Sequence, residues 1–388
     1  MIVVHVVDPF AGGLATFLKL LSEQMNEHYH IIVHGERKEL ADPKDVKKIF
    51  PKKNIRFIHW KSAQRNVNLI KDTKAYLELV QILRRFKHAD VIHLHSSKAG
   101  FLGRIACRQL GLKQVIYTPN GAPFLMSNVS GLKLKFYEQL EKIAHRFGGK
   151  VICASASEQE EYNKIGIDAE FINNGTKIGK HSFLFDKNYN KFRIVTTGRV
   201  VDQKNPKYFN EIAKAFVDLK HFEFVWIGDG EGSSLLDSPN ITITGWLSKE
   251  GVRNEIAKAD LYLSTSVFEG LPFAVIEAMS MGKCLLLSNC TGNIDLVKSG
   301  FNGEVFENKE EAVNNIINFY LNKEITYSMG LNSLEVCKDY FNIEETALRY
   351  NLKYLEVSSL VYKRLSVSQL QKLELSLSAI RGRQTLSS

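Results

Sequence analysis

The stretch Ala259–Glu277, ADLYLSTSVFEGLPFAVIE, decides the fold of this chain. Its first eight residues are rich in apolar and β-prone side chains and predict a strand over 259–266. Gly270 and Pro272 then predict a tight loop, and an apolar helix should begin at Phe273. Strand, loop and helix in this order form the repeating unit of a parallel α/β sheet. A helix that follows such a loop presents unpaired backbone N–H groups and the positive end of its dipole, which favour a phosphate group.

The same stretch carries two carboxylates, Glu269 and Glu277, with seven residues between them. Glu269 falls in the loop and Glu277 about one turn into the helix. Both side chains can therefore face one cleft and have different roles there. The alternative for either glutamate alone is a solvated side chain at an ordinary strand–helix junction.

This alternation of short apolar runs with amphipathic stretches extends along nearly the whole chain, which indicates parallel sheets covered by helices. Residues 173–191 contain few apolar anchors and are typical of a linker. We expect strands near 2–7, 30–34, 55–59, 90–95, 114–118, 150–154, 192–198, 222–227, 240–244, 260–265 and 284–288. Helices are expected in the first half near 14–27, 72–87, 98–110 and 131–147. The predicted parts are a first domain over 1–180, a second domain over 190–340, a helix over 341–360, and a basic amphipathic or disordered tail over 361–388.

The composition is that of a globular protein large enough for two cores, with 388 residues, 44% hydrophobic and 24% charged. No apolar run approaches the roughly 18–20 residues of a membrane span. Met1–Val7 is typical of a buried strand rather than a signal peptide, because no basic region precedes it. The five cysteines lack metal-ligand spacing and predict inert core thiols in a reducing cytoplasm; they are Cys107, Cys153, Cys284, Cys290 and Cys337.

The net charge of +9 is unevenly distributed: residues 1–180 contain 28 Lys and Arg against 17 Asp and Glu, and the remainder 23 against 25. Such asymmetry suggests that the first half faces an anionic membrane surface or a nucleic acid. Near the basic patches there is no recognition-helix, finger or aromatic-stacking signature, which argues against nucleic acid. Solvated lysines that keep the protein soluble are the simpler alternative.

Cations and glycines follow several predicted strands of the second domain. Arg199 ends its first strand and Lys204 opens the next helix, so the two could clamp a diphosphate, the arginine as a fork and the lysine as a point charge. The segment from Gly245 to Leu247 follows a further strand and could bracket a nucleobase with main-chain groups.

Two features of the first domain also fall at expected strand ends. The glycine-rich loop Phe10–Leu14, with Gly13, suits a close approach to phosphate or sugar. It is not a full dinucleotide fingerprint, which weakens a nicotinamide or flavin function. His93 and His95 lie on one face of a strand, and His95, its last residue, should line the cleft. We find no third ligand at metal-binding spacing and expect no metal.

Taken together, these motifs resemble the retaining glycosyltransferases of family 4, over roughly residues 1–355. The resemblance implies the GT-B fold, an α/β architecture of two doubly wound Rossmann-like domains facing a cleft. It also implies that the domain over 1–180 lies on the acceptor side, that the domain over 190–340 binds the nucleotide-sugar, and that the helix over 341–360 crosses back to the first domain. The matching motifs are Gly198-Arg199 with Lys204-Asn205, Gly228-Asp-Gly-Glu231, Gly245-Trp246 and Glu-x7-Glu over 269–277, and more loosely Gly12-Gly13, His93-Leu-His95 and Asn173-Asn-Gly175.

The resemblance implies transfer of a sugar from a nucleotide-sugar with retained anomeric configuration. Arg199 and Lys204 would neutralise the diphosphate in place of a divalent metal. Glu277 would hold the ribose hydroxyls, and Glu269 would lie beside the donor sugar as a catalytic residue.

The remaining implied donor contacts come from both domains. The backbone of Phe273 and Ala274 would lie near the sugar hydroxyls and the phosphates, and Leu247 near the base. From the opposite domain, Gly13 would approach the diphosphate. His95 would be the second catalytic residue and would position or polarise the reacting end of the sugar.

The chain departs from the family pattern in two places. Asn120 stands where many relatives carry histidine. Residues 356–388 extend beyond the usual end, and their apolar and basic side chains are compatible with an interfacial helix or a frayed cationic tail.

The leading hypothesis is a metal-independent retaining glycosyltransferase without a cofactor. It would move a sugar from a nucleotide-sugar, expected to be UDP-linked, to a lipid-linked or surface-polysaccharide acceptor. We expect it in the cytoplasm, peripheral on the inner face of the plasma membrane, with an anionic membrane surface but no nucleic acid as a partner. The alternatives are a UDP-sugar epimerase of the same fold and a non-catalytic subunit that binds sugar nucleotides.

Overall fold

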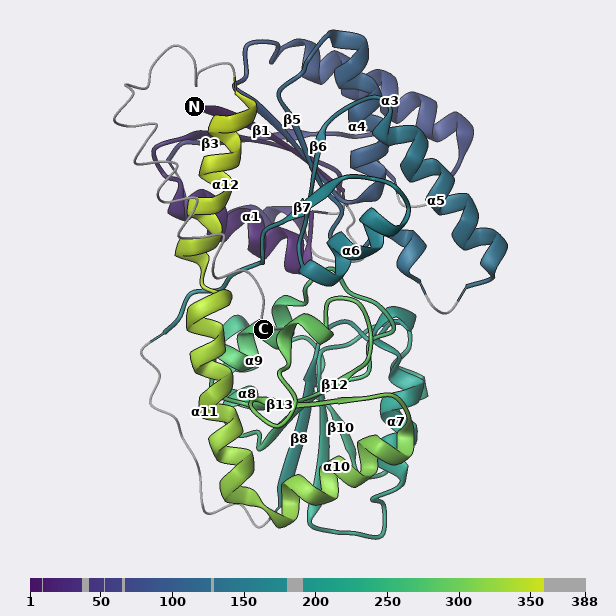
Figure 1. Ribbon diagram of the computed structural model, residues 1–388, viewed down its shortest axis with the longest axis vertical. Coiled ribbons are helices and arrows are strands. Elements are labelled where there is room, and N and C mark those ends of the chain that lie inside the picture. The colour runs from purple at the N-terminus through teal and green to yellow at the C-terminus, as the bar shows by residue number, and fades with distance from the viewer. Residues whose placement is uncertain are drawn as a thin grey trace. The chain divides into compact units, whose positions relative to one another are not determined.

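The computed structural model describes residues 1–8, 10–36, 42–51, 53–64, 67–126, 129–179 and 191–358. These residues form two compact units (Figure 1). The first unit contains Met1–Gly175 and the helix that begins at Ile343, and the second contains Thr176–Asn342. The predicted tail over 361–388 lies outside the described residues.

A seven-stranded parallel sheet in the order β3-β2-β1-β4-β5-β6-β7 forms the centre of the first unit. The strand order reverses at β1 and β4, as in doubly wound folds. Its strands are β1 (Ile2–Val7), β2 (Tyr29–His34), β3 (Ile55–His59), β4 (Val91–His95), β5 (Val115–Thr118), β6 (Lys150–Cys153) and β7 (Ala169–Phe171). Its helices are α1 (Gly12–Gln24), α2 (Pro43–Lys48), α3 (Leu69–Arg84), α4 (Ser97–Leu110), α5 (Gly131–His145), α6 (Ala156–Lys164) and α12 (Ile343–Val357), with the short 3-10 helix η1 (Pro123–Leu125).

The two faces of β4 differ in chemistry. Ile92 and Leu94 belong to the apolar cluster that also contains residues of α3 and α4. His93 and His95 alternate to the other face, as the two-residue period of a strand requires. There they meet aromatic residues of α1 and α12. A polar, histidine-rich layer is thus buried against one face of the sheet.

Helix α12 corresponds to the helix predicted over 341–360. It belongs to the first unit. It buries Tyr350 and Tyr354 completely, and the Tyr354 hydroxyl lies 2.8 Å from Nδ1 of His93. The unit ends at Gly175 rather than near 180. Thr176 groups with the second unit because its N–H donates to the carbonyl of Phe341.

The second unit is built on a six-stranded parallel sheet in the order β10-β9-β8-β11-β12-β13. Its strands are β8 (Phe192–Thr197), β9 (Phe222–Ile227), β10 (Ile241–Ile243), β11 (Leu261–Ser264), β12 (Cys284–Ser288) and β13 (Gly303–Phe306). Its helices are α7 (Pro206–Lys214), α8 (Lys249–Ala257), α9 (Phe273–Ser280), α10 (Lys309–Leu321) and α11 (Lys323–Tyr340), and its 3-10 helices are η2 (Asp202–Lys204), η3 (Ser233–Leu235) and η4 (Ile294–Leu296).

Two strand ends of this sheet approach each other closely. Gly228, directly after β9, has φ +141°, and a Cβ there would lie 2.2 Å from the carbonyl oxygen of Gly198, directly after β8. Only glycine fits such an approach without a backbone shift. The glycine at 228 therefore brings the loops after β8 and β9 together at the carboxyl edge of the sheet.

The cysteines are all free, and four of the five are buried. Burial raises the pKa of Cys107, Cys290 and Cys337 to about 12, so these thiols stay protonated at neutral pH. Across the described part of the chain, no helix combines the length and apolar character needed to cross a membrane.

Candidate active site

The loop after β8 carries the two predicted cations and is fixed by its neighbours. Asn205 adopts a left-handed conformation (φ 52°) and caps α7, its side chain accepting from the N–H of Tyr208. Thr265, directly after β11, donates from Oγ1 to the carbonyl of Lys204 at 2.8 Å. Arg199 lies in the same loop and is half-buried. The loop is thus held to the end of the neighbouring strand.

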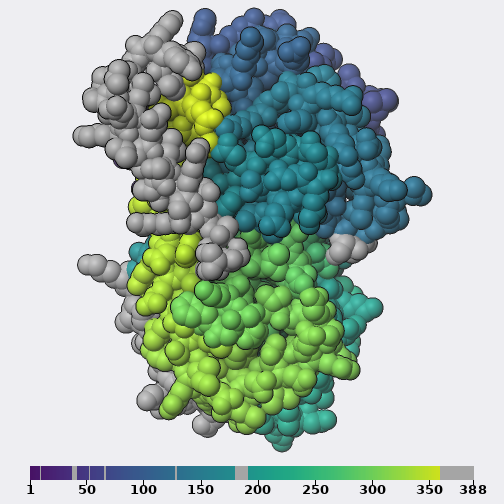
Figure 2. All heavy atoms as spheres, in the orientation of Figure 1, coloured from purple at the N-terminus to yellow at the C-terminus, as the bar shows by residue number. Residues whose placement is uncertain are grey.

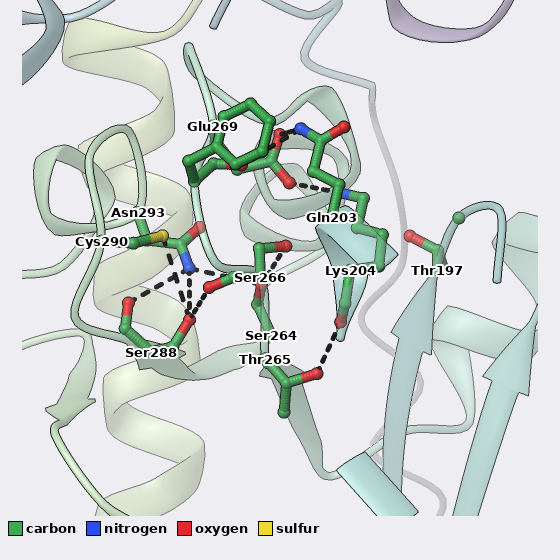
Figure 3. A network of polar contacts seen from close by, with 12 residues as sticks. Thr197, Gln203, Lys204, Ser264, Thr265, Ser266, Glu269, Ser288, Cys290 and Asn293 are labelled. Carbon is green, nitrogen blue, oxygen red and sulfur yellow. Dashed lines mark hydrogen bonds and ion pairs between the residues drawn. The ribbon is translucent and has the colours of Figure 1, made fainter. Parts of the chain in front are cut away.

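The structure pairs Lys204 with Glu269, which the sequence did not predict (Figure 3). Nζ of Lys204 lies 2.7 Å from Oε1 of Glu269, and the two side chains are 21% and 9% exposed. Gln203 donates to the other carboxylate oxygen at 3.3 Å and to the carbonyl of Phe268 at 3.1 Å. Burial lowers the pKa of Lys204, but the Glu269 carboxylate together with smaller contributions from Tyr262 and Cys290 outweighs it, so that the pKa is raised overall. Lys204 therefore remains a cation, held beside a nearly buried anion.

A second polar layer lies behind this pair, at the ends of β11 and β12 (Figure 3). Asn293 is fully buried, and its Nδ2 donates to the carbonyl and the hydroxyl of Ser288 at 3.2 and 3.1 Å. The Ser288 hydroxyl donates to the carbonyl of Ser266 at 2.6 Å. The N–H of Glu269 donates to the carbonyl of Thr291 at 3.0 Å. Residues 288–293 thus orient the Glu269 loop. Sequence reasoning missed them, and the feature that could have indicated them is a polar run directly after a buried strand.

Glu277 lies in the second turn of α9, as predicted, but in a different environment from Glu269. Its Oε1 is 3.6 Å from Nε of Arg253 on α8, an arginine that sequence reasoning missed. The side chain of Glu277 is 25% exposed. Helix α9 begins without a capping side chain, and Phe273 and Ala274 in its first turn are partly exposed. This helix start retains the chemistry that suits an anion.

Leu247 lies beyond β10 in an exposed segment with Trp246; the two are 39% and 63% exposed. Gly13, in the first unit, is not in a loop as expected. Helix α1 begins at Gly12, which has φ +58°, and Gly13 lies exposed in its first turn. Gly12, with its left-handed backbone, permits the sharp turn from β1 into the helix.

His95 is the last residue of β4, as predicted, but its side chain is fully buried and does not line an open surface. It packs against Phe17 of α1, with ring centroids 5.8 Å apart. Its Nε2 lies 3.1 Å from Nδ1 of His5 on the neighbouring strand β1. The two-residue period of the strand correctly placed His93 and His95 on one face of β4. It did not predict that helices cover this face.

The structure also corrects the expectation that His93 and His95 lack a third nearby ligand. Among the described residues, His5 joins them, with ligand-capable atoms all within 4.8 Å of one another. However, Nδ1 of His93 lies 2.8 Å from the Tyr354 hydroxyl, and Nε2 of His93 lies 2.9 Å from Oγ1 of Thr118. Both nitrogens thus already have protein partners, so the cluster fits a hydrogen-bonded network better than a set of metal ligands.

Two doubly wound parallel sheets in one chain are the architecture of GT-B proteins. The ion pair and the helix start lie at the carboxyl edge of the second sheet, where ligands of such sheets bind. Two family models agree: Glycosyltransferase Family 4 matches residues 11–179 and Glycosyl transferases group 1 matches residues 191–322. The chain belongs to this family of GT-B glycosyltransferases, and the predicted family and fold are confirmed.

Among its relatives is the UDP-Gal:α-D-GlcNAc-diphosphoundecaprenol α-1,3-galactosyltransferase of Escherichia coli, 32% identical over 269 residues, which cover 63% of this chain and 68% of the relative. An N,N'-diacetylbacillosaminyl-diphospho-undecaprenol α-1,3-N-acetylgalactosaminyltransferase of Campylobacter jejuni is 21% identical and matches 64% of this chain and 72% of that protein.

Solved structures share the fold at low sequence identity. A sucrose-phosphate synthase from Thermosynechococcus elongatus has a TM-score of 0.77 at 17% identity, covering 92% of this chain and 99% of that one. HepE of Anabaena, in complex with UDP-glucose, has a TM-score of 0.71 at 17% identity, covering 98% of this chain and all of the other.

Proposed function

We propose that this glycosyltransferase moves a sugar from a UDP-sugar to a lipid-linked glycan, with retention of configuration and without a bound metal. The observation that carries the proposal is the Lys204–Glu269 pair beside the start of α9, at the carboxyl edge of the second sheet. A lysine in this place can balance a diphosphate leaving group. The names of the E. coli and C. jejuni relatives support a diphospho-undecaprenol-linked acceptor, and the HepE complex supports a UDP-linked donor.

In the proposed complex, Lys204 leaves Glu269 in part to contact the diphosphate, and Arg199 contributes the second cation. Glu269 is then available to the hydroxyls of the donor sugar. Glu277 accepts hydrogen bonds from the ribose. Its partial exposure and its distant arginine partner at 3.6 Å leave its carboxylate accessible to a ligand.

Further donor contacts are proposed for main-chain groups, namely those of Phe273 and Ala274 near the phosphates and of Leu247 near the base. For Gly13 and His95 of the first unit, contacts to the donor are proposed from the family resemblance alone.

The function is tested by incubating the protein with a panel of UDP-sugars and a short-chain polyprenyl diphosphate that bears one sugar. Mass spectrometry should detect a product heavier by one sugar, and NMR should show that its anomeric configuration matches that of the donor. Activity should persist in excess chelator. A requirement for added Mg²⁺ or Mn²⁺ would overturn the metal-free proposal, and conversion of the UDP-sugar to its epimer without transfer would favour the epimerase.

We further propose that the first unit docks peripherally on the inner, anionic face of the plasma membrane through α5. Leu132, Phe136 and Ile143 on this helix are 84%, 52% and 43% exposed and follow a helical spacing. Lys133 and Lys135 are exposed beside them. Figure 2 shows this blue-to-teal segment at the surface of the first unit. An exposed apolar stripe flanked by lysines is typical of helices that lie in a membrane interface.

Liposome sedimentation tests the docking. The protein should bind anionic vesicles at low salt and be released as salt rises, because charge attraction is screened beyond roughly 10 Å. The double change Lys133→Glu/Lys135→Glu should weaken binding by about 2 kcal/mol, or roughly thirtyfold. The matched control is Lys220→Glu/Lys309→Glu, the same charge change at exposed lysines of the second unit. Equal loss in both variants, or no vesicle binding at low salt, would contradict docking through α5.

A further inference from the structure

The start of α3 presents a cluster of exposed apolar side chains. Val67, just before the helix, is 71% exposed, Leu69 and Ile70 are each 84% exposed, and Leu77 is 54% exposed. Among the described residues, no large apolar side chain is more exposed than Leu69, Ile70 and Leu132. Single apolar groups on a surface need no explanation, but a cluster of them marks a surface that contacts a partner.

The exposed charges along the same helix are all positive; they belong to Lys71, Lys74, Arg84 and Arg85. The two acidic residues of α3 are engaged with the protein instead. Oδ1 of Asp72 lies 2.6 Å from Nζ of Lys98 on α4, and Glu78 accepts from the N–H groups that precede the helix at Lys61 and Ser62, at 3.0 and 2.8 Å. The outer face of α3 therefore combines apolar and basic side chains.

This outer face belongs to a firmly packed helix. The opposite face of α3 is buried in the apolar core through Ala75, Leu79 and Leu83. The Tyr76 hydroxyl of α3 donates to Oε1 of Gln109 on α4 at 2.5 Å, and Arg104 of α4 forms a buried ion pair with Glu141 of α5. Helix α4 thus joins α3 to α5, and the outer faces of α3 and α5 belong to one layer over the first sheet.

The topology places the starts of α3 and α5 at the same edge of this sheet. Helix α3 joins β3 to β4 and α5 joins β5 to β6, so each begins beside the carboxyl ends of parallel strands. Leu69 and Ile70 lie in the first turn of α3, and Leu132 and Phe136 in the first two turns of α5. The most exposed apolar side chains of both helices therefore lie toward the edge at which ligands of open parallel sheets bind.

An anionic bilayer matches the chemistry of this face. The membrane interface takes up exposed leucine and isoleucine, and anionic headgroups attract the lysines and arginines beside them. A second copy of the chain would bring like charges together, and so would the tail over 361–388, which contains five Lys and Arg against one Glu. A nucleic acid would match the cations but leave the apolar side chains in water.

We propose that the start of α3 inserts into the interface of an anionic membrane, so that the first unit contacts the bilayer through both α3 and α5, with the carboxyl edge of its sheet toward the lipid. The joint footprint rests on the docking through α5 proposed above. The contact by α3 does not, because it is inferred from α3 alone.

Sedimentation with vesicles rich in phosphatidylglycerol measures the contribution of α3. At low salt, Leu69→Ser/Ile70→Ser should weaken binding about tenfold or more, because less apolar surface enters the lipid. Both side chains are exposed, so circular dichroism and the unfolding midpoint should be unchanged. The matched control is Leu321→Ser/Ile325→Ser, at side chains of the second unit that are 69% and 55% exposed, and it should bind like the native protein. Native vesicle affinity in Leu69→Ser/Ile70→Ser, or no binding by the native protein, would overturn the inference.

Fluorescence locates the contact directly. Vesicles with brominated acyl chains should quench the added tryptophan of Ile70→Trp, whereas Leu321→Trp should show no quenching beyond that of the native tryptophans. No added quenching in Ile70→Trp would contradict insertion of α3. A dimer in solution that Leu69→Ser/Ile70→Ser abolishes would assign this face to a second copy of the chain instead.

Vesicle binding is measured without donor or acceptor, so its outcome is separate from that of sugar transfer. If Lys133→Glu/Lys135→Glu leaves binding unchanged while Leu69→Ser/Ile70→Ser weakens it, docking through α5 fails and the contact by α3 stands. If both variants weaken binding but no sugar is transferred, the proposed activity fails and the footprint stands. In an active protein, Leu69→Ser/Ile70→Ser should lower turnover of a long-chain acceptor in vesicles but not of a short-chain soluble acceptor. Equal losses with the two acceptors would contradict a role of α3 in membrane contact.

Discussion

Replacing Lys204 by alanine is expected to weaken UDP binding by roughly 10- to 150-fold, the loss of a charge-assisted contact worth about 1.5–3 kcal/mol. The same change should destabilise the second unit by about 3 kcal/mol, because it leaves Glu269 as an unpaired charge that is only 9% exposed. Titration calorimetry with UDP measures the first effect, and urea unfolding measures the second. The losses of affinity and of stability are independent, because Lys204 contacts the diphosphate in the complex and pairs with Glu269 in the ligand-free protein.

The chain offers a matched control in Lys214, whose Nζ lies at the same 2.7 Å from a carboxylate oxygen, that of Asp237. Those side chains are 52% and 63% exposed, so Lys214→Ala should change stability by less than about 1 kcal/mol and leave UDP affinity unchanged. The double variant Lys204→Ala/Glu269→Ala should recover much of the stability but none of the affinity. Native UDP affinity in Lys204→Ala would contradict the assignment of this lysine to the diphosphate.

Every strand expected from the sequence is present, with ends that agree within two residues. The expectation succeeded because buried parallel strands are continuous apolar runs. It missed β7 and β13, which are three and four residues long and carry Glu170 and Glu304. It also missed α6, a strongly polar helix. That helix is fixed by Glu158, a buried carboxylate that accepts from the N–H groups of Gly121 and Ala154 at 2.7 and 2.9 Å.

The candidate site was predictable where its residues are close in sequence, as for the loop and helix that carry Glu269 and Glu277. The contacts that join distant segments were not. Lys204 and Glu269 are 65 residues apart, and His5 and His95 are 90 apart. Strand register brings the latter pair together, since His95 aligns with Val7 on β1. Spacing within one segment indicates on which face of its strand or helix a residue lies. How deeply the side chain is buried depends on the distant segments that pack over that face.

The largest expected effect of pH is a steep loss of stability of the first unit below pH 6.5. Burial lowers the pKa of His30 and His34 to about 4, that of His95 to about 3, and those of His5 and His93 well below the usual 6.5. Below pH 6.5 the unfolded chain binds protons at these positions and the folded unit does not, so unfolding becomes more favourable as pH falls. Each group contributes about 1.4 kcal/mol per pH unit. Between pH 7.5 and 5.5 the five histidines together should cost roughly 5 kcal/mol or more.

The carboxylates act in a different window, which makes the histidine effect separable. Ion pairs hold the pKa values of Glu170 and Glu255 below their usual range despite burial, so the stability they provide is lost only below about pH 4.5.

Urea unfolding at pH 7.5, 6.5 and 5.5 measures the slope of the unfolding free energy with pH. His88→Gln, at an exposed position, should leave the slope unchanged, and His5→Gln should reduce it by the share of one histidine. In the second unit the described histidine is His221, which is only half-buried, so this unit should keep its stability over the same range. A first unit equally stable at pH 7.5 and 5.5 would mean that these imidazoles become charged without unfolding, and their neutral state in the folded unit would then be wrong.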